Sequence, residues 1–368
     1  YSSSFKQEGG VSIETLAPNR WTYDDRSFPT ALSFGDVLLT PQFSDIHSRK
    51  DVSTASALDE VLSFELPVIS SPMDTISEED MAVAMASAGG LSIIHRYNTI
   101  EEQLDIVAKV HERNPDARVG AAIGVSGDYF DRAHALCTSG VSVLCIDVAH
   151  GHHSLVRKAL TELRNTFANS VHIMAGNVAT LEAFDALAEW GADSIRVGIG
   201  GGSICSTRLV SGHGVPTLQS IFDCARTTYD VKIIADGGIQ TTGDMVKAFA
   251  AGADFVMVGS LLAGTQETPG SVYQTNNGEK YKIYRGMASR NAQRDYRGRS
   301  STPEGISTTV PFRGSVEPIL DDFRGGISSG LSYSGVRSLA ELRAKARFVR
   351  QTNSGRAESN THILGRNQ

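Results

Sequence analysis

The glycine-rich string GIGGGSICSTR, residues 198–208, holds the residue best suited to covalent chemistry. Its Cys205 stands in a polar loop after an apolar run, two residues before Thr207. Glycines let the backbone turn its polar groups toward an ion, and a thiolate in such a loop attacks electrophilic carbon. The alternative is a small buried core cysteine. We give that interpretation to the three cysteines in helix- or strand-like patterns, Cys137, Cys145 and Cys224.

Two further glycine strings predict a phosphate cradle. IADGGI (234–239) and VGS (258–260) each end an apolar run. Loops that follow strands in α/β barrels bind phosphate through backbone N–H groups. The natural donors here are Ser203, Gly238 and Ser260. The alternative is that these glycines only make tight turns between strands and helices.

Carboxylates stand at the ends of two more apolar runs. SSPMDT (70–75) contains Met73 and Asp74, for which core packing and helix capping are the alternative roles. Asp147 ends another run and could accept a hydrogen bond from a ribose hydroxyl. Three histidines follow it, His150, His152 and His153. Because no carboxylate or cysteine stands at ligand spacing from them, we interpret them as solvated loop residues rather than a metal site.

A basic segment, residues 284–305, predicts a mobile flap over an anionic substrate. Its arginines are Arg285, Arg290, Arg294, Arg297 and Arg299. The alternative is a solvated run of charge. Nucleic-acid binding is not favoured, because the 34 Lys and Arg and the 41 Asp and Glu give the chain a net charge of −7.

Eight short apolar runs, separated mostly by helix-like patterns, must position these residues. Parallel strands buried on both faces have this continuous apolar character. Eight strand–helix units within about 250 residues predict a (β/α)8 TIM barrel, with an open doubly wound sheet as the alternative. The runs are 66–72, 91–95, 118–124, 141–149, 171–178, 194–200, 231–238 and 255–260.

Two irregular stretches point to a single site. The interval after the sixth run is long, and 264–316 reads as loop. Loops after strands form the face of a barrel that carries chemistry. We expect one domain with three parts: an N-terminal arm at 1–35, the barrel at 36–350 with its flap at 284–312, and a polar tail at 351–368.

Composition excludes several classes of protein. Four cysteines without a CxxC pair predict neither a disulfide scaffold nor a zinc ribbon. No apolar run reaches the length of a membrane span, and the first residues lack the order of a signal peptide. We therefore expect a cytoplasmic protein that binds neither nucleic acid nor membrane.

The strings together resemble the inosine-monophosphate dehydrogenase and GMP reductase family over nearly the whole chain. The resemblance implies a barrel, usually tetrameric, that acts at C2 of a purine nucleotide through a cysteine thioimidate. The matching strings are LSFGDVLLTP, SSPMDT, GLSIIHR, AGNVAT, VGIGGGSICSTR, IADGGI, VGSLLAG, YRGMAS, PEG and ELRAKARFVR.

The resemblance also implies roles for individual residues. Cys205 matches the catalytic cysteine, Thr207 the catalytic threonine and Glu304 the residue that faces the purine edge. The nucleotide-contacting positions are Ser71, Met73, Ser203, Asp236, Gly237, Gly238, Gly259, Ser260, Tyr284, Gly286 and Met287. The cofactor region holds Asp147, Asn177 and Gly198. A potassium site would use the carbonyls of Gly200, Gly202 and Cys205.

Two reactions are known in this family. The dehydrogenase passes hydride from IMP to NAD and hydrolyses the thioimidate to XMP. The reductase expels ammonia from GMP, and NADPH returns hydride to give IMP. The motifs SSPMDT, IIHR and PEGIS favour the dehydrogenase, whereas IDVAHG, VPFRG and the short flap favour the reductase. We take the dehydrogenase reaction as the first hypothesis and the reductase reaction as the alternative. A nucleotide-binding paralogue that does not turn over, or that acts on a modified purine, is a third reading.

The flap is where the two readings differ. Reductases carry a glutamate where this chain has Arg290, in GMASR. Dehydrogenases carry an adjacent Arg-Tyr pair that activates water, and the nearest match here is Arg294 with Tyr296. We assign these two residues as the candidate water-activating groups. If the chain is a reductase, Glu304 is the nearby carboxylate that could replace the missing acid.

Overall fold

A closed barrel of eight parallel strands forms the centre of the computed structural model, which describes residues 28–298 and 302–360. Strand β11 pairs with β4, so the sheet has no edge, and the open-sheet alternative is excluded. Each strand lies within one of the eight expected runs. The strands are β4 (Val68–Ser70), β5 (Leu91–Ile94), β6 (Gly120–Ile123), β7 (Val143–Asp147), β8 (His172–Val178), β9 (Ser194–Val197), β10 (Lys232–Asp236) and β11 (Phe255–Val258).

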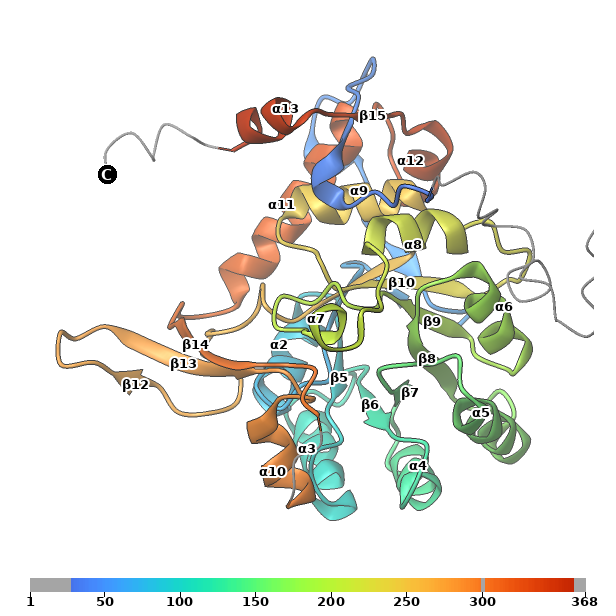
Figure 1. Ribbon diagram of the computed structural model, residues 1–368, viewed down its shortest axis with the longest axis vertical. Coiled ribbons are helices and arrows are strands. Elements are labelled where there is room, and N and C mark those ends of the chain that lie inside the picture. Colours follow the sequence, from blue (N-terminus) through green and yellow to red (C-terminus); the bar gives the residue numbers. More distant parts are fainter. Residues whose placement is uncertain (1–27, 299–301, 361–368) are drawn as a thin grey trace, which may run out of the picture. The chain divides into compact units, whose positions relative to one another are not determined.

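Helices between the strands cover the barrel (Figure 1). Several begin where the sequence places a capping residue: Thr99 accepts from Glu102 N–H, and Thr241 accepts from Asp244 N–H. The helices of this layer are α2 (Glu79–Ser87), α3 (Ile100–Arg113), α4 (Tyr129–Thr138), α5 (Ser154–Phe167), α6 (Leu181–Glu189), α8 (Thr217–Cys224) and α9 (Thr242–Ala251). Two more follow the flap, α11 (Glu317–Tyr333) and α12 (Leu339–Lys345).

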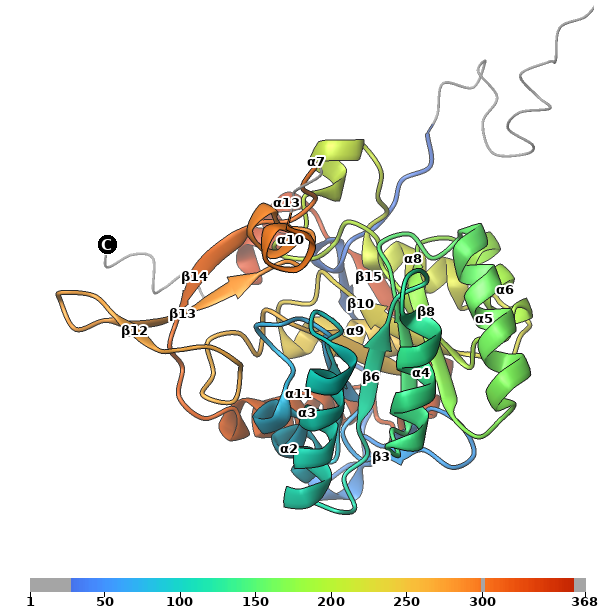
Figure 2. The same ribbon diagram turned by 90° about the horizontal axis from the view of Figure 1, so that it is seen from below.

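A short hairpin of β2 (Ser56–Ala57) and β3 (Ser63–Phe64) closes the barrel at the end opposite α7 and α10 (Figure 2). Apolar side chains of the hairpin pack with those inside the barrel, among them Leu58, Leu62 and Phe64. Asp59 holds the turn of the hairpin and bonds to Nδ1 of the buried His172 on β8 at 2.8 Å. The apolar interior is therefore sealed at this end.

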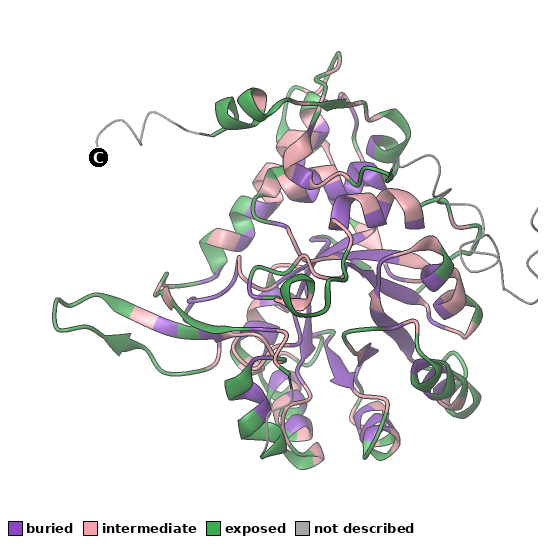
Figure 3. Cartoon of the chain, in the orientation of Figure 1, coloured by how far each residue is buried: buried purple, intermediate pink, exposed green. Residues whose placement is uncertain are grey.

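The stretch 264–316, expected to be loop, is largely ordered. It contains β12 (Tyr273–Gln274), β13 (Lys280–Arg285), α10 (Arg290–Arg297) and β14 (Ser307–Pro311), with β12, β13 and β14 in one antiparallel sheet. The loop prediction was wrong because a surface sheet needs no continuous apolar run, and much of this one is exposed (Figure 3). Buried Lys282 on β13 ties this sheet to the segment after β11: its Nζ donates to the carbonyls of Thr265 and Thr268 at 3.0 and 2.6 Å.

Segments near the two ends of the described chain pair with each other. Strand β1 (Val37–Leu39) is antiparallel to β15 (Phe348–Arg350). The remaining elements are η1 (Phe34–Asp36), η2 (Arg49–Asp51), α7 (Thr207–Ser211) and α13 (Asn353–Glu358). Residues 1–27 and 361–368, in the expected arm and tail, lie outside the described residues, and the expected domain limits stay predictions. No helix among the described residues is long and apolar enough to cross a bilayer.

Helix α11 packs closely on α9, which follows the strand that leads to IADGGI. A Cβ at Gly330 would lie 2.6 Å from Val246 Cγ1, whereas a Cβ at Gly325 would meet no atom within 4 Å. We expect Gly330→Ala to lower the free energy of unfolding by about 1–3 kcal/mol through overpacking. Gly325→Ala, the matched control on the same helix, should be neutral or stabilising. Urea unfolding followed by circular dichroism measures both, and equal effects would contradict the close packing.

Candidate active site

A cavity of about 270 Å³ lies at the carboxyl ends of the barrel strands. Nearly every residue to which the sequence assigned a site role lines it. They are Ser71, Met73, Asp147, Asn177, Gly198, Gly200, Gly202, Ser203, Cys205, Thr207, Asp236, Gly237, Gly238, Gly259, Ser260, Tyr284, Gly286, Met287 and Glu304. The two exceptions are Arg294 and Tyr296. Residues more than 200 positions apart thus meet in one place.

Cys205 stands at the head of a hydrogen-bonded chain. Its Sγ–H donates to Oγ1 of Thr207 at 3.2 Å, and that hydroxyl donates to Oε2 of Glu304 at 3.0 Å. Backbone bonds hold the two segments together: Ser206 N–H donates to the Glu304 carbonyl at 2.8 Å, and Ile306 N–H donates to that of Ile204 at 3.1 Å. A proton that leaves the thiol therefore has a path to a carboxylate.

The other cysteines have different environments. Cys205 is exposed, Cys145 and Cys224 are buried, and Cys137 is partly buried. Burial raises the pKa of Cys145 and of Cys224 to about 12, and that of Cys137 to about 11. Cys145 and Cys224 are core residues, and Cys137 packs against the core, as their sequence patterns indicated. A raised pKa disfavours the thiolate that a nucleophile needs.

Arg196 on β9, which the sequence analysis missed, joins the two carboxylates of the site. Its guanidinium donates to Asp147 Oδ1 at 2.6 Å and to Asp236 Oδ2 at 2.9 Å. Arg196 is only 6% exposed, so each charge depends on the others. Burial lowers the pKa of Arg196, but the attraction of Asp236 and Asp147 outweighs it, and the net shift is upward. The signal in the sequence was a lone arginine in the apolar run 194–200.

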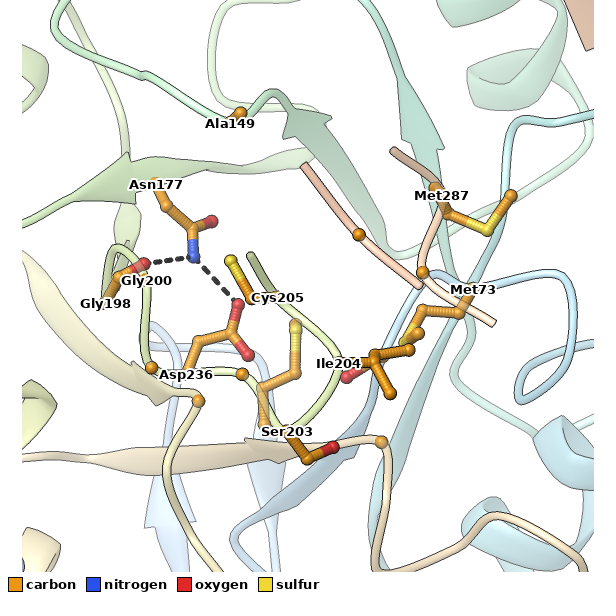
Figure 4. Close-up of a pocket in the computed structure, with 18 of the residues that line it drawn as sticks. Met73, Ala149, Asn177, Gly198, Gly200, Ser203, Ile204, Cys205, Asp236 and Met287 are labelled. Atoms are coloured by element: carbon orange, nitrogen blue, oxygen red, sulfur yellow. Dashed lines mark hydrogen bonds between the residues drawn. The ribbon is translucent and has the colours of Figure 1, made fainter. Parts of the chain in front are cut away.

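Asn177 on β8 links this charged cluster to the cavity. Its Nδ2 donates to Asp236 Oδ2 and to the Gly198 carbonyl, both at 2.9 Å (Figure 4). Its Oδ1 is buried and has no hydrogen-bond partner. A buried amide oxygen without a partner suits a ligand that carries an amide N–H, as the carboxamide of a nicotinamide does.

The glycine strings approach one another as a phosphate cradle requires. Gly237 and Gly238 have φ of +95° and +77°, which glycine adopts without strain. A Cβ at Gly237 would lie 3.1 Å from the Gly202 nitrogen, so the two loops touch through their backbones. Tyr284 is nearly buried beside Ser203, and burial raises the pKa of its phenol. The cradle offers backbone N–H groups and hydroxyls without a lysine.

The expected potassium site is less complete. The carbonyls of Gly200, Gly202 and Cys205 lie on one loop, in which Gly202 and Cys205 are exposed. The Gly202 carbonyl already accepts the Cys205 N–H at 3.1 Å. Three carbonyls on an exposed loop do not surround an ion, so potassium stays a prediction, and no described cluster of His, Cys, Asp and Glu offers another metal site.

The two flap residues expected to activate water do not line the cavity. Arg294 is exposed on α10. Tyr296 donates its hydroxyl to Asp74 and packs against Tyr97, with ring centroids 5.3 Å apart. Burial and the Asp74 carboxylate raise the pKa of Tyr296, which disfavours the phenolate that a base would need.

Comparison with known proteins places the chain in a family. A family model described as the IMP dehydrogenase / GMP reductase domain matches residues 31–362. The chain belongs to this family. Its members are oxidoreductases, so the protein is an enzyme of the IMP dehydrogenase / GMP reductase class.

Relatives carry both names. A GMP reductase of Leishmania major is 34% identical over 92% of this chain and 98% of its own length. An inosine-5′-monophosphate dehydrogenase of Cryptosporidium parvum is 38% identical over 90% and 94%. A crystal structure of a Trypanosoma brucei GMP reductase in complex with guanosine 5′-monophosphate superposes with a TM-score of 0.86 at 32% identity, over 93% of this chain and 99% of that one. These similarities support the family and the barrel. They do not choose between the two reactions, because the relatives include both enzymes.

The contrast among cysteines predicts selective alkylation. In the native protein, iodoacetamide should modify Cys205 and spare Cys145 and Cys224. Cys205 is exposed, whereas burial removes the other two thiols from the reagent and raises their pKa. Peptide mass spectrometry after brief labelling measures this, and GMP should slow the reaction by occupying the cavity. Labelling of Cys145 in folded protein at a comparable rate would contradict the assignment of the nucleophile.

Proposed function

We propose that this enzyme catalyses the reductive deamination GMP + NADPH + 2 H⁺ → IMP + NH₄⁺ + NADP⁺. The observation that carries the proposal is the direction of the hydrogen bonds from Cys205 through Thr207 to Glu304. Transfer of the thiol proton along this chain yields a thiolate and a carboxylic acid together. Loss of an amine from C2 needs both of these groups at one place.

The steps balance in protons and bonds. Sγ of Cys205 bonds to C2 of the purine, and the C2–N bond to the amino group breaks. The departing nitrogen takes its proton from Glu304 through the Thr207 hydroxyl and leaves as ammonia. The thioimidate carbon then accepts hydride, which NADPH supplies when bound, and the thiolate is released. Glu304 is then again a carboxylate, and a proton from solvent restores the Cys205 thiol before the next turnover. A second proton from solvent converts the ammonia to ammonium.

The remaining groups bind and orient the nucleotide. In this proposal the phosphate lies between the loops at Ser203, Gly237–Gly238 and Gly259–Ser260, which line the cavity. Backbone N–H groups of such glycine loops are suitable donors to a phosphate. Asp236 accepts the ribose hydroxyls, since Arg196 and Asn177 leave its second oxygen available. Asn177 Oδ1 and Asp147 lie where the carboxamide and ribose of the nicotinamide half would bind.

Two observations shift the preference from dehydrogenase to reductase. Oxidation of IMP requires a base that activates water, and the expected candidates, Arg294 and Tyr296, lie outside the cavity lining. The acid that reductases carry at the position of Arg290 has a replacement in Glu304, which lines the cavity beside Thr207.

Two assays at 340 nm test the direction of the reaction. With GMP and NADPH, absorbance should fall, with one ammonia released for each NADPH consumed. With IMP and NAD, no NADH should form. NADH and XMP formation would assign the dehydrogenase reaction instead, and no signal in either assay, with GMP still bound, would favour the non-catalytic paralogue.

Glu304→Gln tests the acid. We expect kcat for GMP to fall by about 10²–10⁴-fold, because the variant cannot supply the proton to the leaving amine. Affinity for GMP, measured by calorimetry, should change little. Glu317→Gln, an exposed glutamate at the start of α11, is the matched control. Unchanged turnover in Glu304→Gln would remove this residue from the mechanism.

A further inference from the structure

Flap helix α10 is joined to the barrel by hydrogen bonds to the carboxylate of Asp74, in the loop after β4. Arg285, at the end of β13, donates to Asp74 Oδ2 from Nη2 at 2.6 Å and from Nε at 3.2 Å. Tyr296, on α10, donates its hydroxyl to the same oxygen. The second guanidinium nitrogen of Arg285 reaches Asp295 on α10 at 2.5 Å. The Asp74 side chain is only 7% exposed, so these donors are what compensates its charge.

An aromatic contact completes this attachment. Tyr296 packs on Tyr97, in the loop after β5, and the Arg285 guanidinium lies over the Tyr296 ring at 5.7 Å. Tyr97 is fixed from its other side by Arg96, which lies 5.1 Å from the ring centroid. The helix is thus held against the loops of two neighbouring strands, on the face of the barrel where α7 also lies (Figure 2).

The attachment continues directly into the cavity wall. Met73, which precedes Asp74, and Met287, two residues after Arg285, both line the cavity, and they lie together on the side away from Asn177 (Figure 4). The sulfur of Met287 accepts the backbone N–H of Asp74 at 3.4 Å. A nucleotide against these methionines therefore contacts both sides of the junction between flap and barrel.

The ends of the flap meet at the catalytic carboxylate. Glu304 N–H donates to the Ala288 carbonyl at 3.2 Å, and Ser289 and Gly305 form a β-bridge. The segment that enters α10 and the segment that holds Glu304 therefore lie side by side. Helix α10 begins directly after Ser289, so a shift of the helix pulls on the stem that adjoins Glu304, the carboxylate that Thr207 contacts.

We propose that Asp74, Arg285 and Tyr296 form a latch that couples nucleotide binding to docking of α10 and so positions Glu304 against Thr207. These are positioning residues, since none of the three lines the cavity. The role of Glu304 in the proposal rests on the proposed reaction, whereas the coupling to nucleotide binding does not. Linkage requires the effect to be reciprocal: a nucleotide strengthens the latch, and loss of the latch weakens nucleotide binding by the same factor.

Limited trypsin digestion of the whole protein measures how often α10 is undocked. Its cleavage sites in α10 follow Arg290, Arg294 and Arg297. Cleavage follows the population of the undocked helix when opening is fast relative to cutting. GMP should protect these sites in the wild type. In Asp74→Asn and in Tyr296→Phe, cleavage without nucleotide should rise roughly tenfold or more, the effect of losing one hydrogen bond to a charged group.

The controls separate a latch from general destabilisation. Asn291→Ala alters an exposed position on α10 and should cleave as the wild type does. Tyr296→Phe keeps the ring against Tyr97, so it should remain folded even if Asp74→Asn does not. In both latch variants GMP should protect α10 from trypsin less than it does in the wild type. GMP affinity, measured by calorimetry, should fall by the same factor. In steady-state assays kcat should fall and KM should rise. Cleavage elsewhere in the barrel should not change.

Different results overturn different claims. Protection by GMP that is equal in wild type and latch variants would overturn the coupling, even if the reductase assay succeeds. Protection that is lost in the variants, in a protein that turns over neither GMP nor IMP, would refute the proposed reaction and leave the coupling standing. A fall in GMP affinity without a change in kcat would show that the latch does not position Glu304.

Discussion

The buried guanidinium of Arg196 is the constraint on which the site depends. Two carboxylates stand at strand ends near β9: Asp236 on the neighbouring β10, and Asp147 on β7, which β8 separates from β9. Arg196 places one cation between these two negative charges and is itself buried. Arg196 fixes both, and Asn177 shares one of them. The polar side of the cavity is therefore preorganised, and its acceptors are aimed before any nucleotide arrives.

The proposed nucleophile and acid come from two segments that border this frame. Cys205 and Thr207 belong to the loop after β9, whereas Glu304 comes from the flap beyond β11. Backbone hydrogen bonds and the bond from Thr207 to Glu304 join the two segments. A cleft between a rigid frame and an attached flap suits an enzyme that must admit a nucleotide and then exclude water. The same barrel serves both reactions of the family, so the choice between them rests on which carboxylate or base the flap brings to the cysteine.

Stability and function are separated along the barrel axis. The far end is sealed by the β2–β3 hairpin, with Asp59 bonded to buried His172. At the chemical end the loops carry glycines, charges and an exposed thiol, and the flap sheet contributes little buried surface (Figure 3). Strand ends that do not fill the interior of the barrel can carry polar groups. This face can therefore hold Arg196 and its two carboxylates, although removing these charges from water costs free energy.

The sequence by itself determined the barrel, which follows from local patterns. It also indicated most of the cavity lining, in part from the glycine strings at strand ends and in larger part from the family resemblance. Strands buried on two faces must be continuously apolar, and the residues after them must share one end of the barrel. It did not determine the flap, since the exposed strands β13 and β14 have no apolar run to mark them. Nor could it choose among Arg294, Tyr296 and Glu304, which stand within a few residues of one another. That choice needed the tertiary structure: α10 turns Tyr296 toward Asp74, while a β-bridge between Cys205 and Gly305 brings Glu304 to Thr207. Hydrogen bonds between distant segments leave no periodic trace in a sequence.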